Sequence, residues 1–73
     1  MTNTQQDRLD ALGMAMTLGP TYDRNVATAL KDALLFDQRG ETSAAEHYLL
    51  MAEMRASFIT WDEYQARDPF RSI

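Results

Sequence analysis

Apolar residues recur at three- and four-residue steps along most of the chain, a pattern that predicts amphipathic helices. Thr2 or Thr4 can cap the first helix, and Gly19-Pro20 can end it. Gly13 lies inside that helix, where a close contact with another helix would explain a glycine. The pattern contains no strand-like alternation, so we expect an all-α fold. The predicted helices span residues 5–18, 21–39, 43–59 and 61–67, the last being a short C-terminal helix.

Turn and capping residues separate these segments. Gly40 follows the second stripe, as expected of a residue that closes a helix in the left-handed conformation. Ser43 and Glu46 have the spacing of a capping box, and Thr60 and Glu63 repeat it. The turn at Gly40 is so short that the second and third helices must be antiparallel neighbours.

The third helix is apolar over more than half of its circumference. Only Glu46, Glu53 and Ser57 mark a polar strip on it. The first helix has a narrow apolar stripe, so we expect a second copy of the chain to cover the third helix in a homodimer of helical hairpins. The expected dimer interface consists of Leu50, Met51, Met54 and Phe58.

The length of 73 residues predicts one domain, residues 1–73, with flexible ends at residues 1–4 and 69–73. The chain has no cysteine, which excludes disulfides and thiolate metal sites. Small domains without such reinforcement often recruit a second subunit or a partner. This tendency also favours the homodimer expected from the third helix.

The net charge of −4 comes from interspersed acids and bases without a basic stripe, so we expect no direct binding of nucleic acid. No apolar run approaches the ~20 residues that span a bilayer, and no signal-peptide pattern is present. These features predict a soluble cytoplasmic protein without a membrane partner.

Candidate chemistry is sparse. His47 is the only histidine and no glutamate stands three residues before it, so the Glu-x-x-His pattern of helical metal sites is missing. The three glycines stand far apart, which excludes a phosphate-binding loop. We therefore expect no catalytic, cofactor-binding or metal-binding residues, and no enzyme activity.

The C-terminal segment is the strongest candidate for a binding surface, because aromatic and arginine side chains dominate protein–protein hot spots. Alternatively, Trp61 and Tyr64 fold back as a lid on the third helix. The predicted partner-binding residues are Trp61, Tyr64, Arg67, Phe70 and Arg71.

Residues 29–57 carry a further pattern around Gly40: small, aromatic, glycine, small, large, small. The residues are Ala33, Phe36, Gly40, Ala45, Leu49 and Ala52. This order resembles one tetratricopeptide unit, although Asp32 and Ser57 replace an apolar residue and a proline of that pattern. The resemblance implies a helical hairpin for protein binding. Any tight antiparallel helix pair can converge on the same spacing.

These observations favour a small adaptor or inhibitor that binds and modulates another protein. Compact acidic chains of this kind are typical of phages and bacterial mobile elements, which suggests one origin. The alternatives are a self-assembling structural subunit and an acidic mimic that occupies a nucleic-acid-binding protein.

Overall fold

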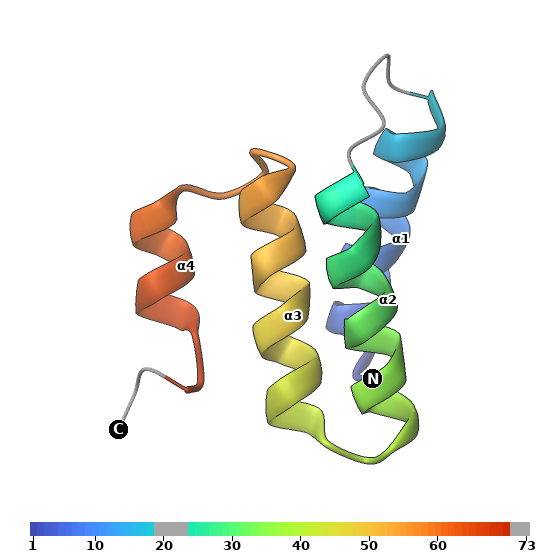
Figure 1. Ribbon diagram of the computed structural model, residues 1–73, viewed down its shortest axis with the longest axis vertical. Helices are drawn as coiled ribbons and strands as arrows, with labels where there is room; N and C mark the ends of the chain where they lie inside the picture. The colour runs from blue at the N-terminus through green and yellow to red at the C-terminus, as the bar shows by residue number, and fades with distance from the viewer. Residues whose placement is uncertain (19–23, 71–73) are drawn as a thin grey trace.

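The computed structural model describes residues 1–18 and 24–70, which form a small all-α bundle without strands. The antiparallel helices α2 and α3 lie side by side, with α1 behind α2 and α4 on the far side of α3 (Figure 1). Among the described residues the four predicted helices are all present. They are α1 (Asn3–Leu18), α2 (Arg24–Gln38), α3 (Thr42–Arg55) and α4 (Trp61–Arg67).

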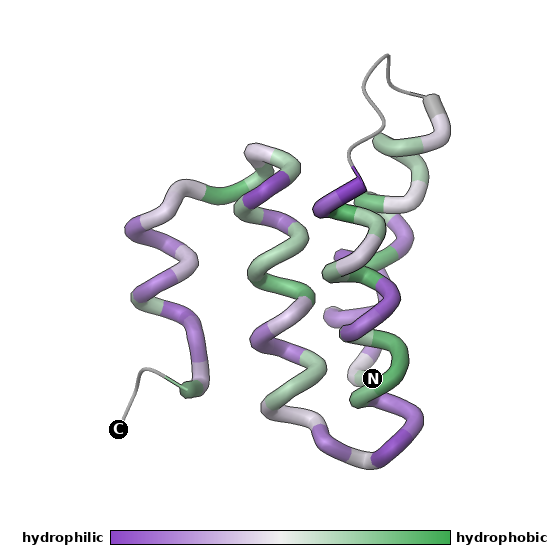
Figure 2. The backbone as a smooth tube through the Cα atoms, in the orientation of Figure 1, coloured by the Kyte–Doolittle hydropathy of each residue, from purple (hydrophilic) through white to green (hydrophobic). Residues whose placement is uncertain are grey.

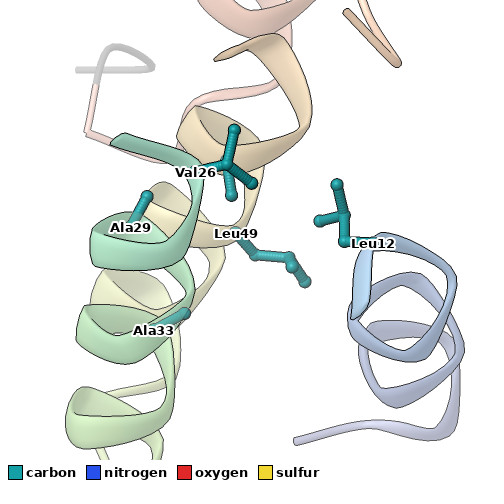
Figure 3. Packing of buried hydrophobic residues seen from close by; sticks show 6 residues of the cluster. Leu12, Val26, Ala29, Ala33 and Leu49 are labelled. Atoms are coloured by element: carbon teal, nitrogen blue, oxygen red, sulfur yellow. The ribbon is translucent and has the colours of Figure 1, made fainter. Parts of the chain in front are cut away.

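The hydrophobic core lies where α1, α2 and α3 meet. Ala29 and Ala33 of α2 and Ala52 of α3 are fully buried, and their small side chains let these two helices approach closely. Leu12 of α1 points toward Leu49 in the same cluster (Figure 3). One chain therefore covers much of its own apolar third helix.

Helix α2 ends as the sequence predicts. Gly40 has φ +76°, and its N–H donates to the carbonyl of Asp37 at 3.0 Å. The N–H of Glu41 donates to the carbonyl of Phe36 at 2.9 Å. This pair of bonds is a Schellman motif, which satisfies carbonyls that the end of the helix leaves open.

Helix α3 ends with the same motif, but a serine replaces the glycine. Ser57 has φ +65°, and its N–H donates to the carbonyl of Met54 at 3.1 Å. The N–H of Phe58 donates to the carbonyl of Glu53 at 2.8 Å. The prediction that the third helix continues to residue 59 is therefore wrong, because the left-handed Ser57 ends it at Arg55.

The start of α3 also differs from the prediction. The helix begins at Thr42, and its N-cap residue Glu41 makes no side-chain capping bond. The predicted capping box of Ser43 and Glu46 is wrong, because the carboxylate of Glu46 bonds to Gln5 and Arg8 of α1 instead.

Two other capping predictions are confirmed. Thr60 Oγ1 accepts from the N–H of Glu63 at 3.1 Å, and the Thr60 N–H donates to the Glu63 carboxylate at 3.2 Å. Thr2 and Gln5 form the equivalent pair before α1, at 3.1 and 3.0 Å. Helix α1 thus begins two residues earlier than expected. The predicted turn at Gly19-Pro20 and the predicted start of the second helix at residue 21 lie outside the described residues.

A charged cluster fastens α1 to α3. Arg8 Nη1 donates to Glu46 Oε1 at 2.8 Å, and Arg8 Nε donates to Glu53 Oε1 at 3.1 Å. Gln5 Nε2 donates to Glu46 Oε2 at 3.1 Å. The predicted polar strip is therefore wrong at these positions: Glu53 is buried and Glu46 is half-buried beneath α1.

The cluster also shifts the protonation equilibrium of its arginine. Burial by itself lowers the pKa of Arg8, but the hydrogen bonds to Glu53 and Glu46 and their negative charges outweigh this effect. The pKa of the guanidinium is raised above its ordinary value. Arg8 therefore stays charged, and its charge compensates two carboxylates that burial would otherwise disfavour.

Candidate functional site: an aromatic row between α3 and α4

Most residues of helix α4 are hydrophilic (Figure 2). Its attachment to α3 depends on the buried Tyr64 and on Asp68 just beyond its last turn. The capping box of Thr60 fixes where the helix begins, and so places Trp61 at its first position.

Trp61 and Tyr64 share one face of α4 and stack on each other. Their ring centroids are 5.4 Å apart and their planes differ by 27°. Tyr64 is buried, whereas Trp61 keeps 52% of its surface exposed. The buried ring therefore supports an exposed one.

Asp68 holds the other end of this surface. Its carboxylate is buried, and Oδ1 accepts from the N–H of Phe70 at 3.0 Å. The same oxygen lies 2.9 Å from His47 Nδ1 on α3. Because Oδ1 acts as an acceptor toward Phe70, we assign the shared proton to His47 Nδ1. Asp68 thus joins α3 to the segment that follows α4.

The ring of His47 in turn supports Phe70. The two rings stack at 4.9 Å with planes 30° apart, and Phe70 remains 49% exposed. The His47 ring also lies 6.1 Å from that of Tyr64. We call Trp61, Tyr64, His47 and Phe70 the aromatic row: its two inner rings are largely covered and its two outer rings are half-exposed.

Further ring contacts connect the aromatic row to α2. Tyr48 meets His47 edge to face at 5.0 Å and stacks on Phe36 at 5.2 Å. The guanidinium of Arg39 lies 5.7 Å from the centre of the Phe36 ring. The outer rings of the row are therefore anchored through α3 to the most extensively packed helix pair of the bundle.

The structure gathers most of the predicted partner-binding residues around α4. Trp61 and Phe70 are half-exposed, and Arg67 is exposed in the last turn. Tyr64 is buried beneath Trp61, as the lid alternative expects for one of the two residues. Arg71 lies outside the described residues.

The residues expected in the dimer interface do not share one surface. Leu50 is fully buried within a single chain, so it is not accessible to a second subunit in this conformation. Met51 packs partly buried against the core, and Met54 is half-buried. Phe58 is about half-exposed in the connection between α3 and α4.

Sequence reasoning missed the roles of His47 and Asp68. The sequence pattern shows His47 only as a lone histidine without a metal-ligand pattern, and it indicates no contact for Asp68. A single hydrogen bond between residues 21 positions apart leaves no periodic signal in the sequence.

The described residues contain no group of three or more metal-ligating side chains close enough to hold an ion. None of the described helices has the length and apolar character needed to cross a membrane. Comparison with protein-family models, with curated proteins and with solved structures finds no match to this chain. The resemblance of residues 29–57 to a tetratricopeptide unit therefore stays a prediction.

Proposed function

We propose that this chain is a small non-enzymatic interaction module that binds another protein through Trp61 and Phe70, the two outer rings of the aromatic row. The observation that carries the proposal is that both rings are half-exposed and yet held by stacking on covered neighbours. Exposed rings that a fold fixes in place differ from scattered surface apolar residues.

Rigid support lowers the entropic cost of binding a partner through these rings. A side chain that becomes ordered on binding costs about 0.5–1.5 kcal/mol in lost rotamer freedom. The stacking on Tyr64 and His47 reduces that cost for Trp61 and Phe70. Tryptophan is also among the residue types most enriched at the centres of interfaces.

The surroundings resemble the rim of an interface. Asp62, Glu63 and Arg67 are exposed on the same short helix, so the outer rings have charged neighbours of both signs. A polar rim around aromatic anchors is typical of partners that associate and separate. We therefore propose an adaptor or inhibitor that acts in the cytoplasm by occupying a surface of its target.

An acidic mimic of nucleic acid receives less support. Two of the carboxylates that contribute to the charge of −4 belong to Glu46 and Glu53. These side chains pair with Arg8 rather than forming a row of exposed charges. The remaining field is weak for a protein that would compete with phosphates.

The test is affinity capture from a lysate of the source organism with three baits: the wild type, a double variant Trp61→Ala/Phe70→Ala, and Leu35→Ala. Leu35 is about as exposed as Phe70 but lies on α2, away from the aromatic row, so it controls for loss of exposed apolar surface. We expect a stoichiometric partner that the wild type and Leu35→Ala retain and the double variant loses.

The captured partner is then purified and titrated. Loss of both rings is expected to weaken its binding by about 30-fold or more. Trp61 is the only tryptophan, so its fluorescence should shift to shorter wavelength when the partner covers it. A partner that binds the double variant equally well, or a lysate that yields no stoichiometric partner, would contradict the proposal.

A further inference from the structure

A second exposed apolar surface lies on the opposite side of the bundle from α4. Helix α1 makes its main helix contacts with α3 and touches α2 little, so a groove is left between α1 and α2. The groove holds a hollow of about 730 Å³. It is lined from α1 by Gly13, Met16 and Thr17, and from α2 chiefly by Leu30 and Leu34.

The groove continues across the outer flank of α1. A second hollow of about 650 Å³ shares Gly13 and Thr17 with the first and adds Leu9, Asp10 and Met14. Gly13 lines both hollows. A Cβ atom built there meets nothing within 4 Å among the described residues. The close helix contact that would explain this glycine is therefore not made within the described part of the chain, and the backbone is open to a helix from outside.

We propose that the occupant of this groove is α1 of a second copy of the chain, with a two-fold axis close to Gly13. A two-fold interface requires that the same patch carry both a projection and the hollow that receives it. Met14 is the projection: it is 61% exposed and stands beside hollows to which its neighbours Gly13 and Thr17 belong.

Charge supports the same arrangement. The outer flank of α1 carries the exposed acids Asp7 and Asp10, whereas the groove side of α2 carries Lys31, with the exposed Arg24 two turns earlier. None of the ion pairs found among the described residues involves Asp10 or Lys31. When α1 of one copy lies in the groove of the other, its acidic flank faces the basic flank of the partner's α2, and the symmetry repeats this contact.

This dimer differs from the one expected around α3, and it goes beyond the proposed function. It leaves α4 facing outward on each copy, because α4 and α1 lie on opposite sides of α3 (Figure 1). Loss of the dimer and loss of the aromatic contact can therefore be measured separately.

The first test is sedimentation of the wild type and two variants over a range of concentrations, with far-UV circular dichroism as the check on folding. Leu34→Glu places a charge in the groove, whereas Leu35→Glu places the same charge on the next residue, outside both hollows. The two leucines are equally exposed, at 41% and 42%, so they form a matched pair.

We expect the wild type to reach twice the chain mass of 8.3 kDa as concentration rises. Leu34→Glu should weaken the dimer by about 100-fold, because the second copy would bury a charge that water solvates in the monomer. Leu35→Glu should change the dissociation constant by less than about threefold. A wild type that stays monomeric at every concentration, or a dimer that responds equally to both variants, would overturn the proposal.

The second test distinguishes a second copy from any other helix. Asp10→Lys and Lys31→Asp should each weaken self-association by about fivefold, because each places like charges opposite one another. An equimolar mixture of the two variants should form a heterodimer about as tight as the wild type, since the lysine introduced into one chain would face the aspartate introduced into the other. A mixture no tighter than its components would show that these positions do not meet across a two-fold axis.

Discussion

Helix α3 is held on one flank by α1 and on the other by α4, and the two attachments differ in kind. On the α1 flank, Leu12 belongs to the same buried cluster as Leu49. The charged cluster that Arg8 forms with Glu46 and Glu53 also joins α1 to α3. On the α4 flank, Tyr64 and the hydrogen bond of Asp68 lie outside that cluster. One flank is part of the core, whereas the other is an addition to it.

The difference determines how each flank responds to damage. Removing a contact that belongs to the core destabilises every element that shares the core. Removing a contact at the edge allows a single segment to open while the rest stays folded. We therefore expect global unfolding from changes on the α1 flank and local opening of α4 from changes on the other.

The largest effect should come from paired truncations of buried side chains on the two flanks. Leu12→Ala is expected to lower the free energy of global unfolding by about 3 kcal/mol, through lost burial and a cavity in the core. Tyr64→Ala should leave that value within about 1 kcal/mol of the wild type but speed amide hydrogen exchange in α4. Urea unfolding and hydrogen exchange measure the two quantities. An equal loss of global stability in both variants would show that the core includes α4.

Loss of the charged cluster around Arg8 should produce the next largest effect. Arg8→Met is expected to cost about 2 kcal/mol of global stability, because it leaves the buried Glu53 and the half-buried Glu46 without a counter-charge. Arg8→Met combined with Glu46→Gln and Glu53→Gln should recover most of that loss, since the uncompensated charges are gone. Thermal unfolding of both proteins provides the comparison. If the triple variant is no more stable than Arg8→Met, packing rather than charge holds this flank.

The smallest effect concerns the turn that leads to α4. Ser57→Gly should stabilise the chain by about 1 kcal/mol, because a left-handed conformation costs a non-glycine residue roughly 1–2 kcal/mol. Gly40→Ala at the matching position after α2 should destabilise it by a similar amount. Urea midpoints of the two variants test the pair. A Ser57→Gly protein no more stable than the wild type would mean that the serine side chain offsets the backbone strain.

The parts of the fold that the sequence predicts correctly are those that local chemistry determines. Gly40 ends α2 and Thr60 caps α4, because each signal is complete within a few residues. The end of α3 was missed because the same backbone motif is formed around Ser57, a residue that gives no such signal.

The tertiary contacts were harder to predict. Glu46 and Glu53 are two turns apart and therefore lie on one face of α3, which is a usable signal for a charged contact with another helix. Choosing Arg8 as the partner requires knowing that α1 lies across that face. The narrow apolar stripe of α1 suggested that it could cover little of α3. In the structure, Leu12 and the charged cluster around Arg8 cover more of α3 than the narrow stripe alone indicates.

The tight turn at Gly40 also bears on how fast the chain folds. It joins the two helices that share the most extensive contacts in the bundle, so most of the core forms between neighbours in sequence. Chains dominated by such local contacts close only short loops before burial stabilises them, and they fold in microseconds to milliseconds. We therefore expect the α2–α3 hairpin to form first, and α1 and α4 to dock onto the surface that it presents.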